Sequence, residues 1–404
     1  MNRERIDLLV TGASEVLTCA ADAPDLVGRI TDGGVAIDAG RIVAVGDISG
    51  YVADRVVDAA GGVVLPGFVD AHTHLVFGGS RIDEYAAAVA GVDPPDDVPV
   101  GIMGTVTETR RYSTADLISQ AEPRVIEMLD HGTTTVEAKS GYGLSDATER
   151  KLLQAAAELH RRLPADIVST YLGAHAYPSD VEPSRYVEQI IDFIPEVAEM
   201  DLAVFCDVYC DRGFFSLEET HRILKAGRDA GLWPKIHLDA YSHTDAAAIA
   251  IELEAASVDH LNFTPVHELE LLADAGIVGV YMPALEFSVA HPQPFEPRVA
   301  MGVGMELALA TDMCPGCWTS SMQFTIVLAC RLGGMSVAQA VRAATYGAAR
   351  SLKLDGEIGS LIPGARADLV LLDVVRYEEI AYRLARNAVT TVIKGGVVVR
   401  EQAA

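Results

Sequence analysis

The chain has 404 residues, half of them hydrophobic, and a formal net charge of −26. A chain of this length can bury a large core and usually forms one large domain with an accessory domain, and the high apolar content excludes a disordered protein. The negative charge argues against nucleic acid and anionic membranes as partners, because both would repel the protein.

The N-terminal sequence and the cysteines predict a cytoplasmic location. Residues 1–7 lack the apolar stretch of a secretory signal peptide. No apolar run approaches the roughly 20 residues that are needed to span a bilayer. The six cysteines are few and scattered, which is typical of reduced thiols in a cytosolic enzyme.

Short β-like segments separated by glycine turns occupy both ends of the chain. They are residues 6–10, 34–37 and 41–46 near the start and 364–373 and 389–399 near the end. Chain termini often lie close together in a folded domain. Residues 1–62 and 357–404 are therefore predicted to form one small composite β-sandwich domain.

Residues 63–356 alternate between apolar runs of strand length and amphipathic segments of helix length. The eight strand candidates are 63–69, 132–137, 167–175, 204–209, 235–237, 256–260, 279–283 and 307–312. Repeated βα units predict an α/β fold, a parallel (β/α)8 TIM-type barrel. One of its helices is expected to begin near Ser145, with Asp146 and Glu149 in the first turn.

Polar residues follow several of these runs, where a barrel of this type carries its active site. His72 and His74 follow the first run two residues apart, so on a strand both imidazoles point to the same side. His237 follows a middle run and Asp312 follows the last. These four residues form a His₃Asp set that suits one Zn²⁺, or Fe²⁺/Fe³⁺, with a position left for water. The alternative for each residue is a hydrogen-bonded structural role.

Two of the polar residues are candidates for proton transfer. A divalent ion lowers the pKa of coordinated water from ~16 toward ~7, and Asp312 at the same site can take the proton. His260 ends another strand candidate and is a second proton-transfer residue or a polarising group. A catalytic role is therefore predicted for Asp312 and His260.

The chain resembles the metal-dependent amidohydrolase superfamily and, within it, the imidazolonepropionase subgroup of histidine degradation. The resemblance covers nearly the whole chain and is carried by residues 66–85, 137–144, 172–176, 235–237, 259–260 and 310–316. The sequences HTHLVFGGSR and KSGYG within them are typical of the subgroup. The resemblance implies one Zn or Fe ion and hydrolytic opening of the ring of 4-imidazolone-5-propanoate, a small anionic cyclic substrate, to N-formimidoyl-L-glutamate.

The resemblance also implies roles for individual residues. The family's metal ligands fall on His72, His74, His237 and Asp312, its substrate-carboxylate arginine on Arg81, its tyrosine on Tyr142, its ring-contacting histidine on His175 and its proton-relay histidine on His260.

The residue types leave three of these roles open. Arg81 follows Gly78-Gly79 and can bind a carboxylate in a bidentate fork, but it can equally form a surface ion pair with Asp83 or Glu84. Tyr142 can be a loop anchor, and His175 a structural histidine.

Three positions depart from the family pattern around the expected ring. Ala240 stands where the family has Glu or Gln, with Asp239 one step away, and Cys314 stands where it has Asn. Cys317 replaces a small hydroxyl residue. Ala240 and Cys314 are predicted to contact the substrate, and the departures favour as an alternative a paralogue acting on an oxo- or thioxo-imidazolidine propionate, with loss of ammonia or sulfide.

Further alternatives concern assembly and other metal arrangements. A non-catalytic scaffold relative is the third hypothesis, against which the complete set of metal-ligand candidates argues. We expect a homodimer. A separate zinc site at the CxxC of Cys314 and Cys317 is not expected, because no second cysteine pair has suitable spacing, and one metal is preferred over a pair bridged by carbamylated Lys139.

Overall fold

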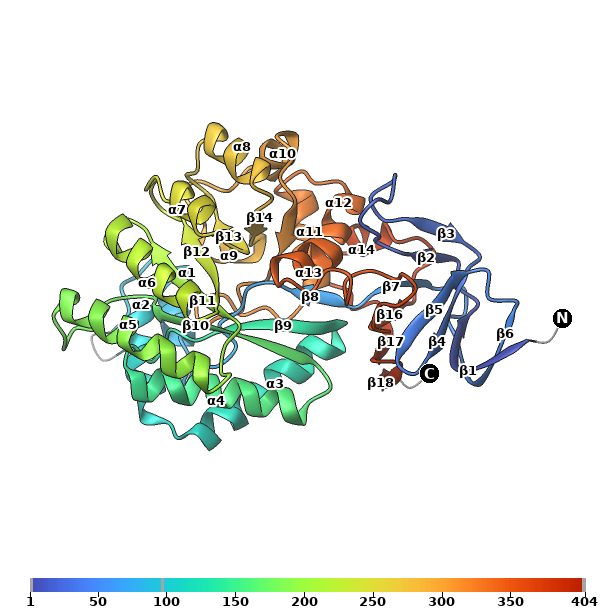
Figure 1. Cartoon of the computed structure of the whole chain (residues 1–404), viewed down its shortest axis with the longest axis horizontal. Helices are drawn as coiled ribbons and strands as arrows, with labels where there is room; N and C mark the ends of the chain where they lie inside the picture. The colour runs from blue at the N-terminus through green and yellow to red at the C-terminus, as the bar shows by residue number, and fades with distance from the viewer. Residues whose placement is uncertain (1–2, 96–97, 402–404) are drawn as a thin grey trace.

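The computed structural model describes residues 3–95 and 98–401. Eight parallel strands form one sheet in the order β15-β14-β13-β12-β11-β10-β9-β8, surrounded by helices (Figure 1). The strands are β8 (Phe68–Asp70), β9 (Thr133–Lys139), β10 (Asp166–Ala174), β11 (Phe205–Cys210), β12 (Trp233–Leu238), β13 (Ser257–His260), β14 (Val278–Tyr281) and β15 (Leu307–Leu309). The predicted (β/α)8 barrel is confirmed, and each of the eight strand candidates contains one of these strands or overlaps it.

The barrel is closed beyond the ends of its first and last strands. The backbone N–H of His74 donates to the carbonyl of Met313 over 2.9 Å, and the N–H of Asp312 donates to the carbonyl of His72 over 3.1 Å. These bonds bring the segment after β8 against the segment after β15. Two predicted histidine ligands and the predicted aspartate ligand therefore lie on adjacent pieces of backbone.

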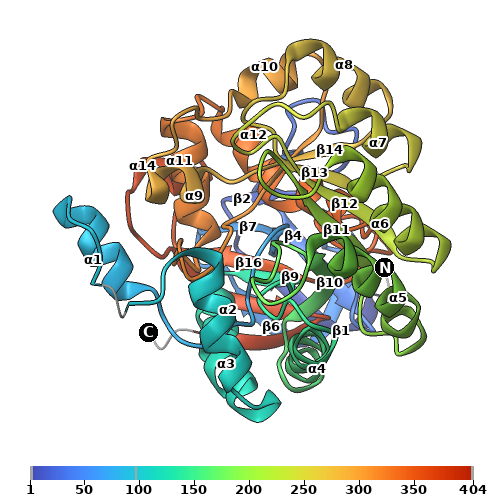
Figure 2. The same ribbon diagram turned by 90° about the vertical axis from the view of Figure 1, so that its left-hand side faces the viewer.

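The helices cover the outside of the barrel, and α1 projects away from it (Figure 2). They are α1 (Ile82–Ala90), α2 (Gly101–Arg111), α3 (Thr114–Asp130), α4 (Asp146–Arg162), α5 (Pro183–Glu199), α6 (Leu217–Asp229), α7 (Ala247–Glu252), α8 (Val266–Asp274), α9 (Pro283–Val289), α10 (Pro297–Gly302), α11 (Met322–Arg331), α12 (Val337–Arg342), α13 (Ala348–Ser351) and α14 (Glu379–Tyr382). A π-helical turn at Ala343–Gly347 joins α12 to α13. Helix α4 begins after Ser145 as predicted. Among the described residues, no helix is both long and apolar enough to cross a membrane.

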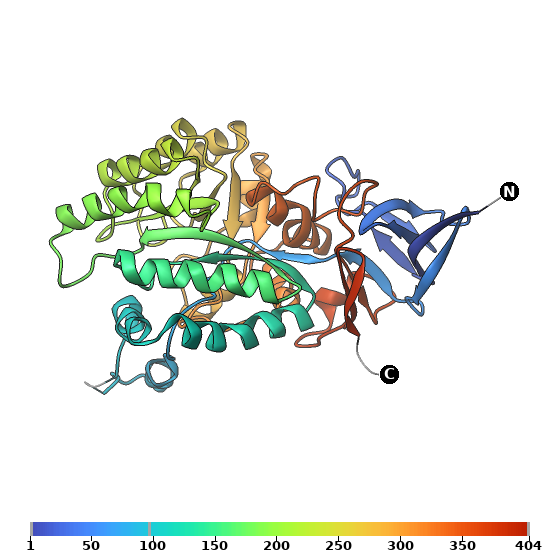
Figure 3. The same cartoon turned by 60° about the horizontal axis from the view of Figure 1, so that its bottom comes forward.

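Two small sheets lie at one end of the molecule, next to both termini of the described chain (Figure 3). One contains β5 (Arg41–Gly46), β4 (Gly34–Asp38), β1 (Glu4–Thr11) and β6 (Tyr51–Asp58), and the other contains β18 (Val397–Glu401), β17 (Val389–Lys394), β16 (Leu369–Leu372), β7 (Val63–Pro66), β2 (Glu15–Leu17) and β3 (Arg29–Thr31). The second sheet thus combines strands from both ends of the chain. A separate hydrophobic cluster, which includes Val35, Val64 and Leu371, packs around these strands.

The first strand candidate, residues 63–69, forms two strands instead of one. Its first half, β7, pairs with β16 in the small sheet, while its second half, β8, pairs with β9 in the barrel. Gly67 lies between them, and a Cβ at this position would collide with the side chain of Thr134. The small sheet consequently extends to Pro66, a few residues beyond the predicted boundary at residue 62.

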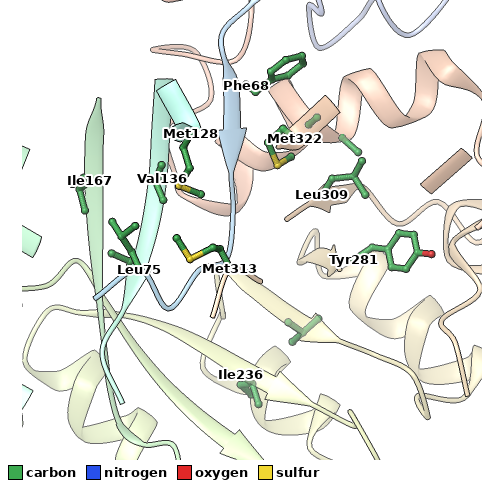
Figure 4. Close-up of a cluster of buried hydrophobic side chains, with 14 of the residues drawn as sticks. Phe68, Leu75, Met128, Val136, Ile167, Ile236, Tyr281, Leu309, Met313 and Met322 are labelled. Carbon is green, nitrogen blue, oxygen red and sulfur yellow. The ribbon is translucent and has the colours of Figure 1, made fainter. Parts of the chain in front are cut away.

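One continuous hydrophobic cluster joins the barrel strands to the helices that cover them. Figure 4 shows part of it, with Val136, Ile167 and Ile236 from the strands beside Met128 of α3 and Met322 of α11. This apolar shell surrounds barrel strands that also carry buried polar and charged side chains.

Candidate active site

A cavity of about 700 Å³ opens at the carboxyl ends of the barrel strands. Its wall contains residues that follow β8, β9, β10, β12, β13 and β15, together with side chains from α1 and α9. The polar and aromatic lining residues are His74, Arg81, Glu84, Tyr85, Tyr142, His175, Tyr209, Phe214, His237, Tyr241, His260, Ser288, Asp312 and Cys314. The position agrees with the rule that barrels of this type bind ligands at this face.

The four predicted metal ligands converge at the base of this cavity. The imidazoles of His72, His74 and His237 offer nitrogens that lie within 4.8 Å of one another, and Asp312 Oδ1 lies 3.8 Å from His72 Nε2 and 3.9 Å from His74 Nε2. Two ligands of one zinc ion are about 3–4 Å apart, given bonds of about 2 Å. The spacing therefore fits a single ion.

The ligand atoms have no other partner among the described residues. His72 Nε2, His237 Nε2 and Asp312 Oδ1 are buried and make no hydrogen bond. Burial holds the pKa of His72 and His74 well below the usual value, so both imidazoles are neutral at pH 7. Neutral imidazole nitrogens and a carboxylate oxygen left unpaired in the same place form the donor set of a divalent transition-metal ion.

Buried carboxylates orient two of the ligand imidazoles from behind. Asp259 Oδ2 lies 2.7 Å from His72 Nδ1, and Asp207 Oδ2 lies 3.0 Å from His237 Nδ1. An imidazole whose Nδ1–H faces a carboxylate presents its unprotonated Nε2 on the opposite side. Asp259 thus selects in His72 the tautomer that a metal ligand requires, while Asp207 lies at ion-pair distance from His237 Nδ1 without a well-aligned hydrogen bond.

These carboxylates belong to a charge network of five fully buried residues, Glu137, Lys139, Asp207, Lys235 and Asp259. The Lys139 ammonium lies 2.7 Å from Asp207, 3.0 Å from Glu137 and 3.1 Å from Asp259, and Lys235 lies 2.9 Å from Glu137. The three carboxylates raise the pKa of Lys139, outweighing the opposing effect of burial. Lys139 is thus a buried cation held by three carboxylates.

His260 and Asp312 lie close to each other, and both have an unusual backbone conformation. The φ angles are +80° at His260 and +49° at Asp312, which are costly for residues with a Cβ and cluster at functional sites. The His260 ring centroid is 5.2 Å from that of His237 and 5.6 Å from that of His72. Burial raises the pKa of Asp312 to about 6 and keeps that of His260 well below its usual value.

Tyr142 and His175 form the aromatic side of the cavity. His175 stacks on His74 with ring centroids 4.7 Å apart, and its Nδ1–H donates to the carbonyl of Gly141 over 3.0 Å. This bond leaves His175 Nε2 as an acceptor. Burial near Cys314 and Asp312 raises the pKa of Tyr142 well above its usual value, so its hydroxyl is a neutral donor.

The loop that carries Tyr142 is held by one buried carboxylate. Glu149 accepts hydrogen bonds from the backbone N–H groups of Gly141, Gly143 and Leu144, over 2.7–2.9 Å. This residue was expected only as a favourable charge in the first turn of its helix. Its position shows why the loop after β9 keeps one conformation.

Arg81 lines the cavity but is paired with Glu84. Its Nε and Nη2 donate to the two carboxylate oxygens over 2.6 and 2.5 Å, and both side chains are about four-fifths buried. The ion pair that was the alternative to a substrate role is therefore present, although in the cavity wall. Nη1 makes no hydrogen bond with the described residues and faces Gly316, where an added Cβ would lie 3.3 Å away.

Ala240 does not take the place expected for it. Its side chain is 1% exposed and absent from the cavity wall, and its carbonyl accepts a hydrogen bond from His291 Nε2. Asp239 has a φ of +53° and turns away, and its carboxylate accepts hydrogen bonds from Thr244 and Thr264. Asp239 therefore does not line the cavity either, and Tyr241 is the residue of this segment that does.

Cys314 lies in the cavity wall, as predicted for a substrate contact, whereas Cys317 is buried behind it. The two residues exchange backbone N–H···O=C bonds of 3.0 and 3.1 Å, which close a tight turn. Burial raises the pKa of both thiols, so both are neutral. Neither belongs to a group of described residues that could hold a metal ion.

Several residues of the site were not anticipated from the sequence. Asp207 and Tyr209 alternate on β11, which was identified as a strand without a site residue, and Tyr209 pairs in register with His237. Phe214 stacks on Tyr209 with centroids 4.0 Å apart. The sequence signal for this part of the site was Asp207, a charged residue in the middle of an apolar run of strand length.

Comparison with known proteins agrees with this architecture. The model of the amidohydrolase family matches residues 63–399. Imidazolonepropionase from Geobacillus kaustophilus is 41% identical over 99% of this chain and 97% of its own length. That from Halobacterium salinarum is 39% identical over 97% of this chain and 98% of its own.

Solved structures with low sequence identity share the fold. An adenosine deaminase from Xanthomonas campestris with bound zinc has a TM-score of 0.71 at 19% identity, covering 99% of this chain and 94% of its own. An atrazine chlorohydrolase from Arthrobacter aurescens TC1, complexed with zinc, has a TM-score of 0.75 at 18% identity, covering 98% and 95%.

Proposed function

The chain belongs to the amidohydrolase family, and from that premise we propose that it hydrolyses the ring of 4-imidazolone-5-propanoate to N-formimidoyl-L-glutamate. Relatives named imidazolonepropionase match it over nearly its whole length, so it is an imidazolonepropionase-like hydrolase acting on carbon–nitrogen bonds of cyclic amides. One observation carries the specific proposal. Three of the four ligand residues line the same cavity as Arg81, the one lysine or arginine in its described wall, and the fourth, His72, lies buried beside them.

We propose that His72, His74, His237 and Asp312 hold one Zn²⁺ or Fe ion. When bound, the ion supplies Lewis-acid activation of water and of the scissile ring bond. The unpaired buried nitrogens and oxygen support this assignment. Imidazole and carboxylate ligands suit both zinc and iron.

The remaining residues bind the substrate and move protons. Arg81 donates hydrogen bonds to the propionate carboxylate from Nη1 and from the second N–H of Nη2, while Glu84 fixes the guanidinium plane. The Tyr142 hydroxyl donates a hydrogen bond to the substrate, and His175 Nε2 accepts a hydrogen bond from a ring N–H. The Asp312 carboxylate takes a proton from the attacking water through its other oxygen, Oδ2, because Oδ1 is the ligand atom. His260 polarises the ring carbonyl or transfers a proton at it.

A related ring is a second candidate substrate, and Cys314 is the observation that favours it. A thiol is a weaker donor and acceptor than the amide that relatives have here, but it is a good contact for a polarisable group. Water would replace the sulfur of a thioxo-imidazolidine propionate, which gives the oxo ring and sulfide, whereas an oxo-imidazolidine propionate, which has no exocyclic nitrogen or sulfur to lose, would be hydrolysed at a ring carbon–nitrogen bond. Ala240 gives this alternative no support, because its side chain does not reach the cavity.

Substrate tests with metal-loaded protein distinguish the two candidates. Imidazolone, hydantoin and thiohydantoin propionates are incubated separately with the wild type and Cys314→Asn, and ring-opened product, ammonia and sulfide are measured. Fast opening of imidazolone by the wild type supports the first candidate. Higher activity on a thioxo ring that Cys314→Asn lowers supports the second, and no turnover of any ring by the metal-loaded protein would contradict both and favour a scaffold.

We also propose a homodimer located in the cytoplasm. The apolar side chains of Ile82, Tyr85 and Val89 on the projecting helix α1 are 58–71% exposed, which supports contact with a second copy. Light scattering with size exclusion measures the mass in solution, and Val89→Asp is expected to shift a dimer toward the monomer. A monomeric wild type at micromolar concentration would contradict the dimer.

A further inference from the structure

A second group of metal-ligating side chains lies outside the active-site cavity. It contains Asp239, His243 and Glu268, each of which offers one ligand atom within 4.8 Å of the others. These residues connect the segment after β12 with the first turn of α8. Helices α7 and α8, which flank this segment, pack against each other at the edge of the barrel (Figure 1).

The distances within this cluster are those of a compact polar site. His243 Nε2 lies 2.7 Å from Glu268 Oε1 and 3.6 Å from Asp245 Oδ1, and His267 Nε2 lies 4.0 Å from Glu268 Oε1. Asp239, His243 and Glu268 thus form the centre of the cluster, and Asp245 and His267 lie at its exposed edge. No lysine or arginine forms an ion pair with these carboxylates among the described residues.

Glu268 is the feature that points to a missing cation. The residue is 7% exposed, its carboxylate faces His243, and its second oxygen, Oε2, is buried without any hydrogen-bond partner in the described chain. A buried carboxylate oxygen normally finds a donor or a metal ion, because a buried polar atom without a partner destabilises the folded state.

We propose that Asp239, His243 and Glu268 bind a second divalent transition-metal ion, of the zinc type, with Asp245 and His267 within reach as additional ligands. Imidazole and carboxylate together suit Zn²⁺ better than Ca²⁺ or Mg²⁺, which prefer oxygen ligands alone. The ion fastens the segment 239–246 to α8. Because Tyr241 projects from this segment into the active-site cavity, the ion acts on the cavity wall without touching the substrate.

The test measures zinc bound to the full-length protein by equilibrium dialysis at fixed free zinc. The wild type is expected to hold about two ions per chain, and His243→Gln and Glu268→Gln about one. His237→Ala removes an active-site ligand and is expected to keep the second ion. His221→Gln is the matched control, because His221 is also exposed and pairs with a carboxylate, Glu252, outside the cluster.

Cobalt(II) substitution adds a readout that does not depend on activity. The visible absorption of cobalt bound at the second site is expected in His237→Ala and absent from the His237→Ala/His243→Gln double variant. Glu268→Gln serves if His243→Gln fails to fold. A wild type that holds about one ion per chain, or a His243→Gln protein that retains two, would overturn the proposal and leave the His243–Glu268 contact as a simple ion pair.

Discussion

Replacing Asp259 with asparagine is expected to weaken metal binding although Asp259 is not a ligand. Its Oδ2 lies 2.7 Å from His72 Nδ1 and 3.1 Å from the Lys139 ammonium, and its Oδ1 accepts from the Ser257 hydroxyl over 2.8 Å. Asparagine keeps an oxygen that can face His72, and its amide can face a reoriented Ser257 hydroxyl. The substitution therefore removes the charge while retaining the shape and the tautomer of His72.

The size of the effect follows from the role of Asp259. Loss of a carboxylate behind a ligand histidine typically lowers metal affinity 10–100-fold, about 1.4–2.7 kcal/mol. The free energy of unfolding is expected to fall by about 1–3 kcal/mol. This is less than the loss typical of a broken buried charge pair, because Lys139 keeps Asp207 and Glu137 as partners. Metal affinity is measured by competition with a chelator, and stability by denaturant unfolding of the metal-free protein.

Asp166→Asn provides the control for general destabilisation. Asp166 is an ion-paired carboxylate of the same barrel, but it begins β10 at the opposite end and bonds Lys394 and Arg366. This variant is expected to lose stability while binding metal as the wild type does. Equal metal affinity in Asp259→Asn and wild type would refute the idea that this carboxylate prepares His72 for the ion.

Three further changes test other parts of the molecule. Arg81→Met is expected to raise KM about 30-fold, or about 2 kcal/mol, with a smaller effect on kcat, and an unchanged KM would move the carboxylate site elsewhere. Glu149→Gln places an amide against the backbone donors around Tyr142, so the free energy of unfolding should fall by about 1–3 kcal/mol, and kcat/KM should fall as well. Unchanged values would show that the loop keeps its conformation without the Glu149 carboxylate. Burial raises the pKa of Glu286 from 4.5 to about 7, so the folded state holds its proton longer than the unfolded state, and stability should fall as pH rises from 4.5 to 7, by about 3 kcal/mol at most. Glu286→Gln should flatten that part of the stability curve measured by urea titration, and an unaltered slope would assign it to other groups.

Local pattern was sufficient to predict the barrel and its chemically active end. Eight apolar runs separated by helix-length segments have few ways to bury their surfaces other than a closed parallel sheet. Polar residues at the ends of buried runs, such as His72, His237 and Asp312, then had to meet at one face. Charge and spacing therefore indicated a metal-ligand set before any contact was known.

Family resemblance transfers positions and not directions, and the predicted substrate contact of Ala240 falls on a side chain that does not line the cavity. The positive φ of Asp239 turns the chain after β12, which directs its carboxylate to Thr244 and Thr264 and takes the Ala240 methyl group away from the cavity. A one-residue change of direction is invisible in a linear pattern. The same limit applies to Arg81, whose pairing with Glu84 depends on how α1 projects from the barrel.

The charge network behind the ligands was decided by the tertiary structure alone. Glu137, Lys139, Asp207, Lys235 and Asp259 come from four different strands, and each looks like an isolated charge in an apolar run. Only closure of the barrel brings each of these anions within 3.1 Å of a cation. The sequence by itself thus determined which residues could bind the metal, whereas long-range packing determined which tautomers and charges they bring to it, because hydrogen-bond partners so distant along the chain leave no local pattern.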